Sequence, residues 1–236
     1  RGGKFIVIDP RKTETAELAD RHLFIRPATD VFFLFALLNA LFEMGYPKNE
    51  FPDWMKGRIE ELRKAAAPYS PESTEKLTGI PAAETRKIAS EFASSGASVC
   101  YGRVGLSTQP FGALCQWLIY ALNTVTGNLD RPGGAMFTKP AFDTVGSPRK
   151  GASGGSYNTY RTKARNLPEF AGEFPSAALA DEILYEGEGK IRALVTSCGN
   201  PVLSTPNGRK LEKAFEKLDF MVSVDFYINE TTKHAH

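Results

Sequence analysis

Short runs of apolar and β-branched residues predict buried strands along the chain. The clearest is Phe5-Ile6-Val7-Ile8, which lies between Gly2-Gly3 and Asp9-Pro10. An uninterrupted apolar run of this length is typical of a parallel strand that is covered on both faces. The same reasoning predicts further strands at residues 22–25, 97–102, 191–196 and 220–224.

Helical spacing of apolar residues predicts two largely buried helices. The first, residues 31–42, is preceded by Thr29-Asp30 and followed by Gly45, which suit the start and the end of a helix. The second, residues 113–125, ends at Gly127-Asn128. Shorter or more polar helices are expected at residues 13–20, 56–67, 82–95, 176–185 and 208–218, and one more begins at Ser70-Pro71.

Strands that alternate with helices predict an α/β protein, and the composition divides it into two parts. Residues 145–156 are rich in Gly and Ser and cannot build a core of their own. We therefore interpret residues 132–175 as a long connection, which inside a compact protein is usually functional or bridging. Residues 1–131 and 176–236 then form two separate α/β units.

Composition and charge exclude several classes of protein. Of the 236 residues, 42% are hydrophobic, which is enough for a packed core. The 29 Lys and Arg against 27 Asp and Glu give a formal charge of +2, so nucleic acid is not an expected partner. No apolar stretch approaches the ~20 residues of a membrane span, and no export signal is visible. We expect a cytoplasmic location in preference to a periplasmic one.

The cysteines and the chain ends complete this picture. Cys100, Cys115 and Cys198 have no CxxC spacing, which argues against a disulfide scaffold, a structural zinc site and a cysteine-ligated iron–sulfur cluster in this chain. The chain begins with Arg1 rather than Met and stops after a strand-like segment. We therefore expect it to be a piece of a longer polypeptide.

The candidate chemistry lies directly after the expected strands, where ligands bind in open α/β sheets. An acidic residue there can accept the hydroxyls of a ribose or the paired N–H groups of a guanine, while Arg, Lys and backbone N–H groups suit phosphate. Simpler interpretations remain open: Asp9-Pro10 as a common turn, residues 102–109 as an ordinary loop and Asp30 as a helix N-cap. The segments concerned are 9–11, 101–109, 197–204 and Asp225.

Other motifs add little. Neither G-x-G-x-x-G nor G-x-x-x-x-G-K-[ST] occurs, so a simple dinucleotide or P-loop site is not supported. His234 and His236 lack a third metal ligand nearby in sequence. Cys198 has no His close to it in sequence and is better explained as a small residue at a strand end than as a nucleophile.

Taken together, several segments resemble, in order and spacing, the interior of catalytic subunits of the molybdopterin oxidoreductase family. This family includes dimethyl sulfoxide reductase, formate dehydrogenase and periplasmic nitrate reductase. The most specific segments are IDPRKTET and TGNLDRPGG. The full set is residues 8–16 (IDPRKTETA), 26–30 (RPATD), 102–109 (GRVGLSTQ), 122–134 (LNTVTGNLDRPGG), 199–201 (GNP), and 224–225 (VD) with 230–232 (ETT).

The resemblance implies two Rossmann-like three-layer units with mostly parallel sheets. Residues 1–131 would be the later part of a first domain that binds molybdopterin guanine dinucleotide, 132–175 the connecting loop, and 176–236 the start of a second such domain. Two of these cofactors hold molybdenum or tungsten in the family. The implied activity of the full-length enzyme is two-electron or oxygen-atom transfer to or from a small substrate, with this chain alone inactive.

The resemblance also assigns cofactor contacts residue by residue. Asp9 and Asp225 would occupy related places at strand ends, as acceptors for guanine or ribose. Ala28 stands where the family usually has Gly or Gln, so a contact there would come from the backbone. The full set is Asp9, Pro10, Arg11, Lys12, Thr13, Ala28, Thr29, Asp30, Gly105 and Gln109 near the pterin, Asn200, Val224 and Asp225.

No catalytic residue and no metal ligand is assigned within the chain. The cysteine cluster for an iron–sulfur centre and the segment that supplies the protein ligand to the metal, both known in the family, have no counterpart here. An electron-transfer subunit is an implied partner of the full-length enzyme. Two alternatives stay open: a stand-alone α/β nucleotide-binding module without redox activity, and a family member with non-redox chemistry, such as hydration at tungsten.

Overall fold

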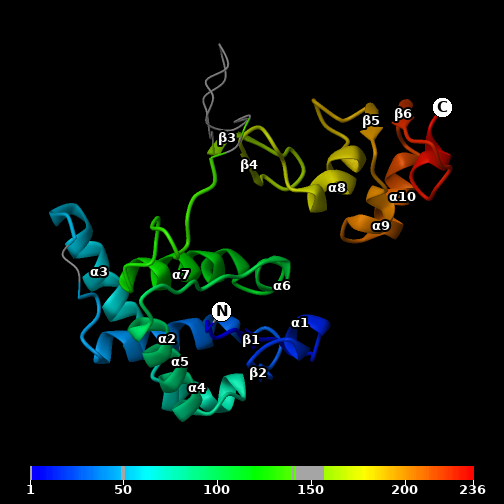
Figure 1. Ribbon diagram of the computed structural model, residues 1–236. Coiled ribbons are helices and arrows are strands. Elements are labelled where there is room, and N and C mark those ends of the chain that lie inside the picture. The colour runs from blue at the N-terminus through cyan, green and yellow to red at the C-terminus, as the bar shows by residue number, and fades with distance from the viewer. Residues whose placement is uncertain (1, 49–50, 140, 142–156) are drawn as a thin grey trace. The chain divides into compact units, whose positions relative to one another are not determined.

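The computed structural model describes residues 2–48, 51–139, 141 and 157–236. It divides into two compact units, Arg1–Thr138 and Lys139–His236 (Figure 1). Helices alternate with small parallel sheets, which confirms the predicted α/β class.

The first unit begins with two short parallel strands. β1 (Ile6–Ile8) pairs with β2 (Arg21–Leu23), and Ile8 lies opposite Leu23 at their carboxyl ends (Figure 1). The connection holds α1 (Glu14–Glu17), which Thr13 caps by accepting a hydrogen bond from the Ala16 amide at 3.2 Å. Because the strands are parallel, the residues that follow them emerge at the same edge of the sheet.

A helical layer packs around α2 (Asp30–Glu43), whose residues are buried on almost every side. Leu38 and Leu41 are completely buried, so α2 is the centre of the core of this unit. The helices in contact with it are α3 (Asp53–Ala66), α4 (Pro71–Thr78), α5 (Ala82–Ser94) and α7 (Gly112–Val125).

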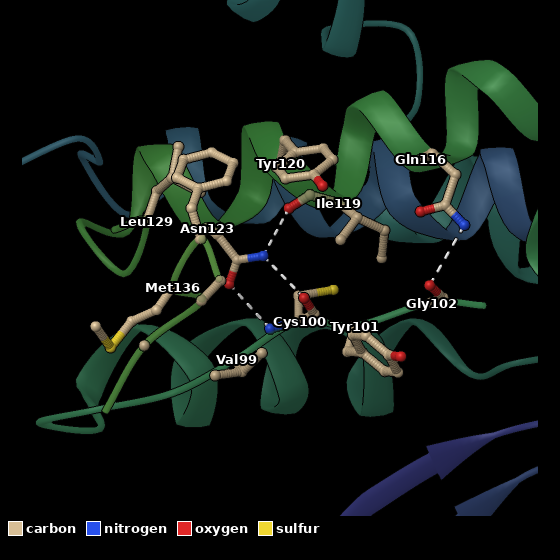
Figure 2. A pocket seen from close by; sticks show the side chains of 13 residues that line it. Val99, Cys100, Tyr101, Gly102, Gln116, Ile119, Tyr120, Asn123, Leu129 and Met136 are labelled. Atoms are coloured by element: carbon tan, nitrogen blue, oxygen red, sulfur yellow. Dashed lines mark hydrogen bonds between the residues drawn. The ribbon is translucent and has the colours of Figure 1, made fainter. Parts of the chain in front are cut away.

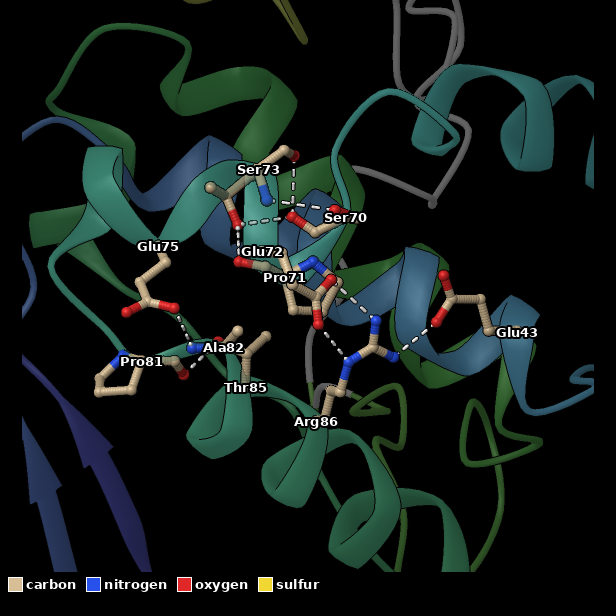
Figure 3. A network of polar contacts seen from close by, with 11 residues as sticks. Glu43, Ser70, Pro71, Glu72, Ser73, Glu75, Pro81, Ala82, Thr85 and Arg86 are labelled. Atoms are coloured by element: carbon tan, nitrogen blue, oxygen red, sulfur yellow. Dashed lines mark hydrogen bonds and ion pairs between the residues drawn. The ribbon is translucent and has the colours of Figure 1, made fainter.

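Polar contacts join the ends of α2, α4 and α5 (Figure 3). The guanidinium of Arg86 donates to both carboxylate oxygens of Glu72 at 2.7 and 2.9 Å and to Glu43 at 2.5 Å. The hydrogen bonds from Arg86 lower the pKa of Glu72 to about 2. Glu75 accepts from the Ala82 amide at 3.1 Å, so α4 also supplies a cap for α5.

The strand predicted at residues 97–102 is wrong. The residues are not paired with another strand in the part of the chain that the structure describes, and side chains bond their backbone instead. The following loop contains a short helix, α6 (Val104–Ser107), where only a loop was expected.

Part of the expected connection in the second unit is ordered as a hairpin. β3 (Tyr157–Arg161) pairs antiparallel with β4 (Pro168–Phe170). Glu169 is fully buried there and accepts from the amides of Thr159 and Tyr160 at 2.8 and 3.3 Å. The predicted Gly/Ser-rich stretch at 145–156 lies outside the described residues.

The rest of the second unit is an α/β arrangement around a parallel pair. β5 (Ala193–Ser197) and β6 (Phe220–Val224) are in register from end to end, with Ser197 opposite Val224. Ile183, Leu211 and Met221 form the centre of its core. The helices are η1 (Ser176–Ala178), α8 (Leu179–Leu184), α9 (Pro201–Ser204), α10 (Gly208–Phe215) and η2 (Thr232–His234).

Candidate functional site

Asp9 follows β1 and holds a tight turn with only part of its carboxylate. Its Oδ1 accepts from the Arg11 amide at 2.7 Å, and its amide donates to the Leu23 carbonyl at 3.2 Å. The ring Nε2 of His22 lies 3.0 Å from the Asp9 carbonyl oxygen. Within the described residues Oδ2 has no hydrogen-bond partner, so half of this carboxylate can accept from a ligand.

The residues after Asp9 add positive charge to the same turn. Pro10, Arg11 and Lys12 are exposed, and neither cation has an ion-pair partner among the described residues. By contrast, Arg21 in the neighbouring strand pairs with a glutamate at 2.7 Å. Thr13 has its oxygen engaged as the cap of α1 and keeps its O–H to donate.

Residues 28 and 29 lie between β2 and α2, and residue 30 begins α2. Ala28 has φ 66°, a left-handed conformation, and Thr29 donates from its hydroxyl to the Arg26 carbonyl at 2.7 Å. Thr29, not Asp30, is the N-cap, and Asp30 is the first residue of α2. The amides of Ala28, Asp30 and Val31 have no partner in the described chain, so this turn offers N–H donors at the start of a long helix.

Gly105 lies in α6, and its carbonyl accepts from the side-chain amide of Gln109 at 3.2 Å. A Cβ added at Gly105 would meet nothing within 4 Å, and its φ is not left-handed. Gly112 differs, since a Cβ there would come within 2.1 Å of the Ser107 carbonyl oxygen. The described fold thus requires glycine at 112 but leaves open space at 105.

Side-chain amides bond the extended segment that leads into this loop. Asn123 on α7 accepts from the Cys100 amide at 3.0 Å and donates to the Cys100 carbonyl at 2.8 Å (Figure 2). Asn128 accepts from the Ser98 amide at 3.3 Å. The sequence analysis missed both asparagines. For Asn123, the available signal was a carboxamide in the mostly apolar run 113–125; Asn128 lies in the turn after it.

A cavity of about 310 Å³ lies between this segment and α7. Tyr101 and Gly102 line it from the segment, Gln116 and Tyr120 from the helix, and Met136 from the turn that follows (Figure 2). It joins apolar surface to the amides of Gln116 and Asn123. Such a surface suits a flat, polar ring.

Asp225 repeats at β6 the turn that Asp9 makes at β1. Its Oδ1 accepts from the Tyr227 amide at 3.0 Å, again two residues on, and Oδ2 has only a long contact of 3.5 Å with Asn229. Val224, the last residue of β6, has an exposed side chain and accepts from the Cys198 amide at 3.0 Å. Each unit therefore places an aspartate carboxylate at the end of a parallel strand.

Asn200 follows β5 and is fixed by the turn before η2. Its amide donates to Glu230 at 2.7 Å, and its Oδ1 accepts from the Thr231 hydroxyl at 2.7 Å. The first of these bonds holds the pKa of Glu230 below its ordinary value. Asn200 keeps one N–H and one lone pair for a further contact.

Two of the three cysteines are protonated at neutral pH, and the described residues contain no cluster of metal ligands. Burial raises the pKa of Cys100 to about 12 and that of Cys115 to about 11, so both stay protonated at neutral pH. Within the described ranges no three His, Cys, Asp or Glu residues gather as metal ligands. Nor does any helix there have the length and apolar character to cross a bilayer.

Comparison with known proteins gives consistent matches. The chain is 26% identical to the assimilatory nitrate reductase catalytic subunit of Bacillus subtilis and 30% identical to the F420-dependent formate dehydrogenase 2 subunit alpha of Methanococcus maripaludis, over 99% of the chain in both cases. Among solved structures, acetylene hydratase from Pelobacter acetylenicus shares the fold of the whole chain, with a TM-score of 0.78 and 21% identity.

The chain spans about a third of each of these relatives: 35% of the nitrate reductase, 36% of the formate dehydrogenase subunit and 36% of the hydratase. A family description, molybdopterin oxidoreductase, matches it over residues 1–236. This match confirms the family that the sequence segments predicted. The chain belongs to the molybdopterin oxidoreductase family.

Proposed function

We propose that the chain forms cofactor-binding walls in an enzyme that moves two electrons, or an oxygen atom, to or from a small substrate. The cofactor would be two molybdopterin guanine dinucleotides with molybdenum or tungsten, and when bound it supplies the redox chemistry. The residues of this chain bind and orient it. The nitrate reductase and formate dehydrogenase relatives support this class of reaction.

The matching turns of Asp9 and Asp225 carry the proposal. Each aspartate uses Oδ1 to accept from the amide two residues on, at 2.7 and 3.0 Å. Each leaves Oδ2 without a short hydrogen bond. A guanine offers adjacent N–H donors and a ribose offers hydroxyls, which are the groups that a strand-end carboxylate accepts from. One such turn per unit fits one nucleotide per unit.

The surroundings of Asp9 fit the phosphates of a nucleotide. Arg11 and Lys12 are free cations in the described chain, and the Ala28 and Asp30 amides are free donors. β1 and β2 are parallel neighbours, so both groups emerge at the same sheet edge. Cations and helix N-terminal amides are the usual ligands of a pyrophosphate.

The loop at Gly105 would face the pterin. Open space at Gly105 leaves room for a ring to approach the backbone, and the nearby cavity presents the amide of Gln116 beside apolar surface. These residues would orient the cofactor and exclude water, and no proton transfer is assigned to them. An iron–sulfur cluster and an electron-transfer subunit are proposed only for the full-length protein.

The test replaces one carboxylate oxygen by an amide. In the full-length protein, Asp9→Asn and Asp225→Asn retain Oδ1 to hold the turn, but the new NH₂ group opposes the guanine N–H donors. Loss of charge-assisted hydrogen bonds should weaken nucleotide binding by about 10- to 100-fold. Guanine released on denaturation and metal content, per polypeptide, measure the outcome.

Asp20→Asn is the matched control, because Asp20 accepts from the Phe5 amide at the opposite end of β1. It should keep the wild-type content of guanine. If both the Asp9 and the Asp225 variants kept the wild-type content of guanine, the proposed role of these carboxylates in binding the nucleotide would be refuted. Guanine without molybdenum or tungsten in the wild-type protein would instead favour a nucleotide-binding module without redox activity.

A further inference from the structure

The extended segment at residues 98–102 has one edge bonded to side chains instead of a strand. Both the amide and the carbonyl of Cys100 bond Asn123, at 3.0 and 2.8 Å. Two residues earlier, the Ser98 amide donates to Asn128 at 3.3 Å. Two residues later, the Gly102 carbonyl accepts from Gln116 at 3.4 Å.

The spacing of these contacts is that of a β-ladder. In a strand, alternate residues direct their backbone groups to the same edge, and the bonded residues 98, 100 and 102 follow this period of two. A carboxamide carries donors and an acceptor like those of a peptide group, so it can replace the neighbouring strand. We call Gln116, Asn123 and Asn128 the amide ladder.

Rigid parts of the first unit support the amide ladder. Asn123 and Asn128 are 1% and 3% exposed, and Asn123 also donates to the Ile119 carbonyl of its own helix at 2.8 Å. α7 packs on α2 in the core. The ladder therefore fixes the register of residues 98–102 against a helix that cannot easily move.

Beyond Gly102 the ladder reaches the loop itself. Gln116 donates to the Ser107 hydroxyl at 2.8 Å, and Ser107 is the last residue of α6, which contains Gly105. Its second contact, with the Gly102 carbonyl, lies at the start of the same loop. Gln116 thus bonds both sides of Gly105 along the chain.

We infer that the amide ladder positions the loop 102–109 for the cofactor, with Asn123 as its central positioning residue. The inference rests on the proposed function, since it assigns the loop a ligand. Asn123 itself is not a contact, because its amide is occupied by Cys100 and Ile119. Its effect on the cofactor passes through the backbone of residues 98–102.

The test is Asn123→Asp in the full-length protein, followed by hydrogen exchange. The carboxylate keeps an acceptor for the Cys100 amide but loses the donor to two carbonyls, at 2.8 Å each. Amides of residues 98–109 should exchange about tenfold faster, while those of α2 stay as in the wild type. Guanine content should fall in the same variant.

Asn39→Asp is the matched control. Asn39 is another buried amide of this unit, which donates to the carbonyls of Ala66 and Ala67 at 3.2 and 3.4 Å and has no contact with the ladder. It should leave the exchange of residues 98–109 and the guanine content unchanged. If Asn123→Asp fails to fold, Gln116→Ala at the half-buried end of the ladder should speed exchange of residues 103–109 alone.

Unchanged exchange at residues 98–109 in Asn123→Asp, or in Gln116→Ala where that variant replaces it, would overturn the inference. The inference would also be overturned if Asn123→Asp exchanged faster at residues 98–109 but kept as much guanine as the control Asn39→Asp. The loop would then not position the cofactor. The Asp9 and Asp225 variants test the proposed function separately. Full guanine content in those variants, together with loss of guanine in Asn123→Asp, would refute the strand-end carboxylates and support the ladder.

Discussion

The same substitution, glycine to alanine, should have opposite effects at Gly105 and Gly112. Gly112 begins α7, and an added Cβ would lie 2.1 Å from the carbonyl oxygen and 2.6 Å from the carbonyl carbon of Ser107. These are backbone atoms, so no side-chain rotation can relieve the contact. Gly105 lies in α6, and a Cβ there would meet no heavy atom within 4 Å.

The magnitudes follow from these distances. Non-bonded atoms are stable at ~3.5 Å or more, so Gly112→Ala forces α6 and α7 apart, at the roughly 1–3 kcal/mol typical of overpacking. Gly105→Ala has no steric cost, and alanine is favoured over glycine in a helix by about 0.5–1 kcal/mol. The free energies of unfolding of the two variants should therefore differ by about 1.5–4 kcal/mol.

The assay measures stability and cofactor content together. In urea unfolding of the cofactor-free proteins, the midpoint of Gly112→Ala should lie below that of the wild type, and that of Gly105→Ala at or above it. If the loop approaches the pterin, Gly105→Ala should nevertheless lose guanine, because its methyl group fills the open space. Equal midpoints for Gly112→Ala and the wild type, or a Gly105→Ala protein less stable than both, would refute the reasoning from close approach.

Two further predictions concern the helices of the first unit. The pKa of Glu72 is lowered from 4.5 to about 2 by Arg86, so this contribution to stability is complete above pH 4.5 and is lost as the pH falls through 2. Unfolding midpoints measured between pH 5 and 2 should fall less steeply in Arg86→Met, and parallel curves would contradict the assignment. Leu38→Ala should cost about 2–5 kcal/mol because Leu38 is fully buried. Leu18→Ala, at a residue 84% exposed, should change the midpoint little, and similar losses in both would be inconsistent with the described core.

The elements that could be predicted from the sequence are those whose own residues determine them. α2 and α7 are long apolar runs with clear ends, and β6 was expected at the residues where it lies. The hairpin of β3 and β4 gave no such signal. Its strands are mostly exposed, and it depends on the buried carboxylate of Glu169, which accepts from the opposite strand.

Residues 97–102 show why a local pattern is insufficient. The mostly apolar run ASVCYG predicted a strand, but a strand is defined by the neighbour with which it pairs. Here the neighbour is Asn123 on a helix, more than 20 positions later, and Asn128 in the turn after it. Sequence periodicity contains no information about which distant carboxamide will meet a backbone group.

In the candidate site, too, some features could be predicted from the sequence and others depend on the tertiary fold. Asp9 and Asp225 could be predicted because an acidic residue directly after a buried strand is visible in the sequence, and the turn that frees one oxygen needs only the amide two residues on. The sequence could not show which of these polar groups already have a hydrogen-bond or ion-pair partner within the protein. Asn200 has its amide already engaged by Glu230 and Thr231, whereas Arg11 is free of any ion pair in the described chain. Those contacts join residues about 30 positions apart, so the ligand-binding capacity of each group depends on the tertiary fold even though its position depends on the strand before it.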